Sequence, residues 1–251
     1  DDATIIDSSD FMKSENEILK NLKKFKGNDF PSINLSILSD SSTQYLDKFI
    51  RAYGLEKQFN VKIWNAPIDQ IEQQIYNPKS LYHKEKNDLT VVFESTHSLL
   101  KKYNNSICKD NFSNSEFNRI KEYLSELINL NRDIVLFNFY EINDYVFGNY
   151  SSLIADSFIF QLRKLNFLLS DFLRNEDQVR ILDTSSINNL LGSSNIFDSS
   201  LYINYDMVFN IKGNFEVSKK VIDIILSKKA LFNKCIIIDL DNTMWGGIIG
   251  D

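Results

Sequence analysis

The chain alternates between two patterns of hydrophobic and polar residues. Short runs of β-branched and other apolar residues predict strands, while longer stretches with apolar residues every three or four positions predict amphipathic helices. The predicted strands cover residues 33–38, 59–64, 88–95, 133–139, 179–183 and 234–240. The predicted helices cover residues 10–26, 43–53, 68–75, 117–130, 151–173 and 215–230. Gly54 is expected to end the helix that precedes it, since glycine commonly follows the last helical residue.

Strands that alternate with helices indicate βαβ units and therefore a parallel sheet. The crossovers of such units are right-handed. We therefore expect an α/β fold of the flavodoxin-like type, with a parallel sheet and helices on both of its faces. Ligands of such sheets bind beyond the carboxyl ends of the strands, so the residues that follow each strand are the first candidates for chemistry.

Composition and charge narrow the possible functions of the 251-residue chain. It is 43% hydrophobic and carries a formal net charge of −6, which argues against a nucleic-acid partner. No apolar run approaches the roughly 20 residues that span a bilayer, so we expect no membrane partner. The two cysteines, Cys108 and Cys235, form neither a disulfide framework nor a zinc-ligand set. A reducing cytoplasm is the expected location.

Serine and asparagine residues follow two of the predicted strands. Ser41 lies just after the first strand, where a side chain on a tight strand-to-helix turn is exposed to a substrate. Ser41 could be a nucleophile, or Ser41 or Ser42 could cap the next helix. Asn138 follows the fourth strand. Its amide could donate to an oxyanion or tie down the following loop.

Three other strand-end or loop residues carry titratable side chains. His97 follows the third strand and is either a general base or a packed side chain. Asp183 is expected to cap the helix after the fifth strand. Asp198 lies in a loop with no evident helix to cap, where it could orient a base, act as one, or form a structural bond. Because no histidine follows residue 97, a simple serine hydrolase is disfavoured.

The last eighteen residues, KCIIIDLDNTMWGGIIGD, resemble the first motif of the haloacid dehalogenase (HAD) superfamily. The run DLDNT followed by WGG and IG is similar, more narrowly, to FkbH-like proteins. The resemblance implies that Asp239 is the phosphoryl-accepting nucleophile and Asp241 the acid/base, with Mg²⁺ held by both carboxylates in a complete HAD domain. The family's later motifs do not occur in the chain, so we expect no phosphatase activity from residues 1–251.

FkbH-like proteins carry a domain similar to SGNH hydrolases before the phosphatase domain. Residues 39–43, with the sequence SDSST, resemble its first block and place Ser41 at the nucleophile position. The other matching positions are Asn138 with Phe139, Gly148, Asn166, and Asp198 in a loop that usually reads Trp-x-Asp-x-Arg. Phe197 and Ser200 depart from that loop pattern, and the SGNH Asp-x-x-His is absent. These departures weigh against independent ester hydrolysis.

The resemblance and the pattern together predict three segments. Residues 1–30 form an N-terminal helical segment, residues 31–231 an SGNH-like α/β domain, and residues 232–251 the first strand and motif of a HAD domain. The expected function is to help transfer a glyceryl or other short acyl group from a small phosphorylated precursor to an acyl carrier protein, in polyketide or surface-polysaccharide biosynthesis. The alternatives are a docking module without chemistry and an SGNH-type esterase or deacetylase acting on a surface sugar.

Overall fold

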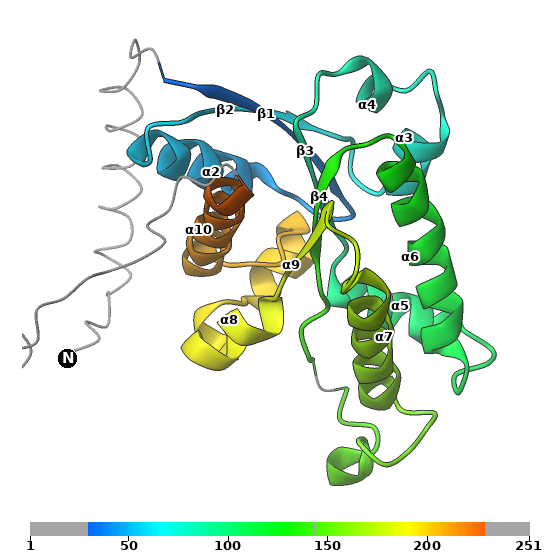
Figure 1. Cartoon of the computed structure of the whole chain (residues 1–251). Coiled ribbons are helices and arrows are strands. Elements are labelled where there is room, and N and C mark those ends of the chain that lie inside the picture. Colours follow the sequence, from blue (N-terminus) through cyan, green and yellow to red (C-terminus); the bar gives the residue numbers. More distant parts are fainter. Residues whose placement is uncertain (1–29, 143, 229–251) are drawn as a thin grey trace, which may run out of the picture.

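The computed structural model describes residues 30–142 and 144–228, which form a five-stranded parallel sheet in the order β2-β1-β3-β4-β5 (Figure 1). The strands are β1 (Ser32–Ser39), β2 (Asn60–Asn65), β3 (Leu89–Phe93), β4 (Asp133–Phe137) and β5 (Val179–Leu182). The predicted parallel α/β fold is thereby confirmed. The strand predicted at 234–240 and the helix predicted at 10–26 lie outside the described residues.

Helices cover both faces of this sheet (Figure 1). On one side lie α2 (Gln44–Glu56), α8 (Thr184–Leu191), α9 (Ser199–Tyr205) and α10 (Ile211–Lys228). On the other side lie α3 (Ile71–Tyr76), α4 (Leu81–Lys84), α5 (Thr96–Asn105), α6 (Phe112–Asn129) and α7 (Phe158–Leu173). Short 3-10 turns, η1 (Gly148–Tyr150) and η2 (Ser193–Asn195), lie in the connections.

Two hydrophobic cores follow from this layering, because successive side chains of a strand point to opposite faces of the sheet. In β3, Val91 packs in the core under α2 and α10, while Val92 packs in the core under α6 and α7. All five residues of β3 are buried, as expected for a central strand with both faces covered. This burial explains why the strands read as continuous apolar runs.

Several helix boundaries differ from the sequence prediction: α6 begins at Phe112 and not at residue 117, and α10 begins at Ile211 and not at residue 215. Two further differences have a clear local cause. Helix α2 continues past Gly54 to Glu56. A Cβ on Gly54 would stand 2.6 Å from Val61 Cγ2, so this glycine serves the close contact of α2 with β2 and does not end the helix. Helix α7 begins at Phe158 and not near residue 151, because Ser157 caps it by accepting a hydrogen bond from the Phe160 amide at 3.1 Å.

Candidate functional site

Polar residues gather at the carboxyl edge of the sheet, as the strand order requires. Asp40 follows β1, Ser95 follows β3, Asn138 follows β4 and Asp183 follows β5. Hydrogen bonds connect them in pairs across neighbouring strand ends: Asp40 with Ser95, and Asn138 with Asp183. Polar side chains therefore bridge β1 to β3 and β4 to β5 at this edge.

Ser41 is not exposed at this edge. Its side chain is 1% exposed, and its Oγ lies 3.2 Å from Ser39 Oγ. The adjacent Ser42 amide donates to the carbonyl of Asp206 at 2.9 Å, which holds the segment after α9 against the turn. The expectation of an exposed Ser41 is wrong for this reason. The capping alternative is wrong too, since Thr43 occupies the N-cap position of α2 without a side-chain bond to the helix. A catalytic role for Ser41 stays a prediction.

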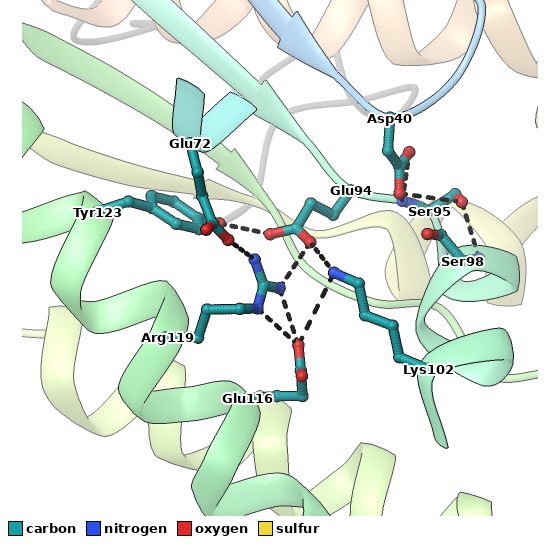
Figure 2. Close-up of polar contacts among 9 residues, drawn as sticks. All are labelled: Asp40, Glu72, Glu94, Ser95, Ser98, Lys102, Glu116, Arg119 and Tyr123. Atoms are coloured by element: carbon teal, nitrogen blue, oxygen red, sulfur yellow. Dashed lines mark hydrogen bonds and ion pairs between the residues drawn. The ribbon is translucent and has the colours of Figure 1, made fainter. Parts of the chain in front are cut away.

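Asp40 is a site residue that the sequence reading passed over, although it lies beside Ser41. Its two carboxylate oxygens accept hydrogen bonds from the Ser95 amide at 3.0 and 2.9 Å (Figure 2). The pKa of Asp40 is raised to about 6, chiefly by burial; the Ser95 hydrogen bond opposes this shift, and the nearby charge of Glu94 adds to it. Ser95 also caps α5 by accepting from the Ser98 amide at 3.1 Å. Asp40 thus anchors the first turn of α5.

His97 lies in that anchored turn and is held by aromatic rings. Its Nδ1 lies 2.7 Å from the Tyr140 hydroxyl, and its ring stacks on Tyr202 with the centroids 4.2 Å apart. Tyr140 in turn stacks on Phe197 at 4.1 Å. Burial and the neighbouring Lys101 lower the pKa of His97, so the imidazole is neutral at pH 7.

A cavity of about 720 Å³ opens beside His97. Its lining includes the apolar side chains of Ile142, Ile159 and Phe197. A charged pair also lines it, since Arg163 Nε and Nη2 donate to the Glu141 carboxylate at 2.7 and 2.8 Å. Polar residues make up most of the lining, with these three apolar side chains among them, so the cavity can hold a small molecule with both polar and apolar parts. Ser41 is not among the described residues that line the cavity.

The Asn138 side chain connects the end of β4 to the residues that follow β5 through hydrogen bonds. Its Nδ2 donates to Asp183 Oδ1 at 2.7 Å, and its Oδ1 accepts from the Thr184 amide at 2.7 Å. Asp183 also accepts from the Ser185 and Ser186 amides, which confirms that it is the N-cap of α8. The geometry matches the loop-tying alternative for Asn138. Its oxyanion role stays a prediction.

Asn166, in α7, forms a second side-chain connection, in this case to the backbone of the segment after β4. Its side chain accepts from the Phe139 amide at 3.0 Å and donates to the Phe139 carbonyl at 2.6 Å. The residue after Asn138 is thereby tied to α7, and the course of the chain toward Tyr140 is set.

Asp198 caps a helix that the sequence reading missed. It is the N-cap of α9 and accepts from the Ser200 amide at 2.9 Å and from the Ser200 hydroxyl at 2.6 Å. The Ser200 hydroxyl and amide bonds lower the pKa of the Asp198 carboxyl. The expectation that no helix needs Asp198 is wrong. Helix α9 has only seven residues and no strong apolar periodicity, so the sequence pattern does not predict it. Its predicted catalytic role is not tested by this contact.

A partly buried ion cluster lies next to the site, on the side of α6 (Figure 2). Arg119 pairs with Glu94 at 2.7 Å, Glu72 at 2.6 Å and Glu116 at 2.8 Å. The Tyr123 hydroxyl donates to Glu94 at 2.8 Å. Burial by itself would raise the pKa of Glu94, but Arg119 and Lys102 outweigh it and hold that pKa below its usual value. Since every charge is paired, this cluster reads as structural.

The residues predicted to hold Mg²⁺, Asp239 and Asp241, lie outside the described part of the chain. Within residues 30–142 and 144–228, no three His, Cys, Asp or Glu side chains are grouped so that they could hold a metal ion. In the same residues, no helix combines the length and the apolar character needed to cross a membrane.

The strand order, the helical layers and the polar carboxyl edge define the class: a doubly wound α/β domain built on a parallel sheet. The family model "FkbH, N-terminal domain" matches residues 34–226. The chain therefore belongs to the FkbH N-terminal domain family.

A solved relative supports this membership. The N-terminal part of the protein BF1531 from Bacteroides fragilis, described as containing a phosphatase domain complexed with Mg, is 32% identical with a TM-score of 0.82. The match covers 92% of this chain and 62% of that chain. This chain thus spans about three fifths of that relative's length.

Other solved structures are similar at a much lower level. A putative acylhydrolase, BF3764 from Bacteroides fragilis NCTC 9343, is 11% identical with a TM-score of 0.47, covering 84% of this chain and 96% of that one. The acetyl xylan esterase AlAXEase is 12% identical with a TM-score of 0.46, covering 77% of this chain and all of that one. Similarity this low does not inform the activity. No curated protein sequence matches the chain.

Proposed function

We propose that this domain holds a short acyl group during its transfer from a small phosphorylated acyl donor to the thiol of an acyl carrier protein. The observation that carries the proposal is the cavity of about 720 Å³ beside His97, in a chain of the FkbH N-terminal domain family. The cavity lies at the carboxyl edge of the sheet, where ligands of doubly wound folds bind. Its mostly polar lining, with apolar side chains at Ile142, Ile159 and Phe197, suits a short hydroxylated acyl group, and glyceryl is the first acyl group to test.

The transfer needs no ester on Ser41. The carrier thiol attacks the acyl carbon directly, a carbon–sulfur bond forms, and the bond from the acyl carbon to the phosphate oxygen breaks. Phosphate leaves with the bonding electrons, and the thiol proton passes to it. Burial of Ser41 and the contact of its Oγ with Ser39 favour this direct route over a serine intermediate.

The experiment is intact-protein mass spectrometry of residues 1–251 mixed with a holo acyl carrier protein and short acyl phosphates, including phosphorylated glyceryl donors. We expect acylated carrier from the wild-type chain and from Ser41→Ala. Ser152, an exposed residue of the cavity wall, offers a blocking variant: Ser152→Trp should lower the transfer rate at least about tenfold by occluding the acyl site. Ser170→Trp, exposed on α7 and outside the cavity, is the matched control and should transfer normally.

Two outcomes favour other functions. An acyl adduct on the chain that disappears in Ser41→Ala would restore Ser41 as a nucleophile and with it the esterase-like alternative. Carrier binding without transfer would favour the docking module, which the burial of Ser41 also suits. Acidic carrier proteins bind such a module through a local basic patch, so that binding would weaken as salt is raised.

A further inference from the structure

The hydrogen bond between His97 and Tyr140 is buried at the back of the candidate site. The Tyr140 side chain is 1% exposed, and its hydroxyl oxygen lies 2.7 Å from His97 Nδ1. A hydroxyl hidden from water needs a protein acceptor for its hydrogen, since an unmade buried hydrogen bond costs about 1–3 kcal/mol. The direction of this bond decides which nitrogen of His97 carries the proton.

Both partners are uncharged at neutral pH. Burial raises the pKa of Tyr140 well above its usual value, so the phenol keeps its proton. Burial likewise lowers the pKa of His97, so the neutral imidazole carries a proton on only one of its two nitrogens. Two arrangements remain: the phenol donates to Nδ1, or Nδ1–H donates to the phenol oxygen.

Donor and acceptor strengths select between these arrangements. A phenol is a stronger donor than a neutral imidazole N–H, and the bare imidazole nitrogen is a stronger acceptor than a phenol oxygen. The hydroxyl of Thr96 also lies near the Tyr140 hydroxyl, but its hydrogen goes to the Tyr140 carbonyl at 2.9 Å and its oxygen is the weaker acceptor of the two. Tyr140 therefore donates to Nδ1, which leaves the proton of His97 on Nε2.

Packing holds the imidazole in this orientation. His97 stacks on Tyr202, and Tyr140 stacks on Phe197, so neither ring can turn without breaking a ring contact. At the other end of the turn, Asp40 anchors Ser95, two residues before His97. The side chain of His97 also lines the cavity.

We propose that Tyr140 is a positioning residue that keeps His97 as the Nε2–H tautomer, and that His97 donates this hydrogen to the carbonyl oxygen of an acyl ligand in the cavity. The inference rests on the proposed function for the identity of the ligand, but the tautomer does not. As a thiol attacks the acyl carbon, its oxygen gains negative charge, and a donor already in place stabilises that charge. His97 is then an electrophilic residue and not the general base that an esterase requires.

The tautomer can be read directly by nitrogen NMR, because the chain contains only two histidines, His83 and His97. In ¹⁵N-histidine-labelled protein at pH 8, with His83→Gln to assign the signals, we expect His97 Nδ1 to have the shift of a bare nitrogen and Nε2 that of a protonated one. Tyr140→Phe removes the phenol hydrogen and should bring the two shifts toward the averaged values of a mixed tautomer. Tyr202→Phe keeps the stacked ring and should leave them unchanged.

A protonated Nδ1 in the wild-type chain would overturn the inference, and so would unchanged shifts in Tyr140→Phe.

The transfer assay tests the second half of the proposal, that His97 donates its Nε2 hydrogen to the acyl carbonyl oxygen. Loss of one preorganised oxyanion donor lowers the rate about 10²–10³-fold, so His97→Ala should show a loss of this size. Tyr140→Phe should lose about tenfold in kcat, with little change in the KM of the donor. Faster transfer in Tyr140→Phe would instead indicate that His97 acts as a general base. Expected NMR shifts without any transfer would leave the tautomer standing and refute the proposed function.

Discussion

At the scale of single residues, two carboxylates next to the site, the buried Glu94 and the partly buried Asp40, are stabilised in opposite ways. Glu94 is ionised because Arg119 and Lys102 pair with it at 2.7 and 3.1 Å. Asp40 accepts hydrogen bonds from Ser95 and has no cation among its direct hydrogen-bond partners in the described chain. Burial without a direct counter-charge is expensive for an anion, and so the pKa of Asp40 rises to about 6 whereas that of Glu94 falls.

The ion cluster predicts a large effect for its central cation. Arg119→Met removes the stronger of the two cations that pair with Glu94, which is 6% exposed, and should cost about 3–5 kcal/mol in the free energy of unfolding. Arg174→Met is the matched control. Arg174 lies 3.4 Å from Asp171 in an exposed pair, and its loss should cost less than about 1 kcal/mol. Urea denaturation of both variants measures the difference, and equal costs would contradict the structural reading of the cluster.

Asp40 predicts a pH dependence of stability. Its pKa is about 6 in the folded chain against 3.8 for the ordinary side chain, so the folded state binds the proton more tightly between these values. Stability from this group therefore rises as the pH falls. The unfolding free energy of the wild type, minus that of Asp40→Asn, should increase by about 2 kcal/mol from pH 7 to pH 4.

The matched control for this pH series is Asp177→Asn, an exposed aspartate in the turn before β5. Denaturation of this variant should follow the wild-type pH dependence. A flat difference between wild type and Asp40→Asn across the same range would show that Asp40 ionises normally.

At the scale of elements, several helices begin at the site with a side-chain cap. Ser95 caps α5, Ser157 caps α7, Asp183 caps α8 and Asp198 caps α9. Each cap fixes the residue at which its helix starts. The cap therefore also fixes the position of side chains in the first turn, such as His97. Local polar residues in this fold therefore position the site through the helices that they begin.

The first turn of α10 predicts a packing effect that opposes helix propensity. A Cβ on Gly213 would lie 2.6 Å from the carbonyl oxygen and 2.8 Å from Cγ2 of Ile196. Alanine favours helices by about 1 kcal/mol over glycine, yet Gly213→Ala should destabilise the protein by about 1–3 kcal/mol because backbone must move. Lys220→Ala, exposed on the same helix, should change the melting temperature little. A stabilised Gly213→Ala protein would mean that α10 does not pack this closely.

At the scale of the whole molecule, the central strand of the sheet is more buried and makes more strand pairings than the edge strand β2. Strand β3 pairs with β1 and β4 and is buried throughout, whereas β2 pairs only with β1 among the described strands. Central strands open only with the whole fold, while edge strands also open locally.

Hydrogen exchange followed by mass spectrometry should show this gradient. Peptides from residues 89–93 are expected to exchange only through global unfolding, and peptides from residues 60–65 considerably faster. Equal protection of the two segments would contradict the strand order. A denaturant series provides the control, since only the rates of globally protected amides fall on the unfolding curve.

The sequence alone determined the fold class and nearly every strand, because buried parallel strands are continuous apolar runs and amphipathic helices keep a regular period. It also indicated Asp183 as a cap and, through its last residues and the SDSST block at residues 39–43, the family. Local signals were weakest at short helices: α9 has seven residues, and its start at Asp198 went unrecognised.

Only the tertiary structure decided what each strand-end residue does. Ser41 lies in a turn whose sequence suits exposure, yet the segment around Asp206, over 160 positions away, closes onto it. His97 and Tyr140 follow different strands and meet because β3 and β4 are neighbours in the sheet. Periodicity reports which face of an element is buried, but a contact between distant strand ends depends on strand order and on the packing of loops, and neither is encoded in any local stretch of the chain.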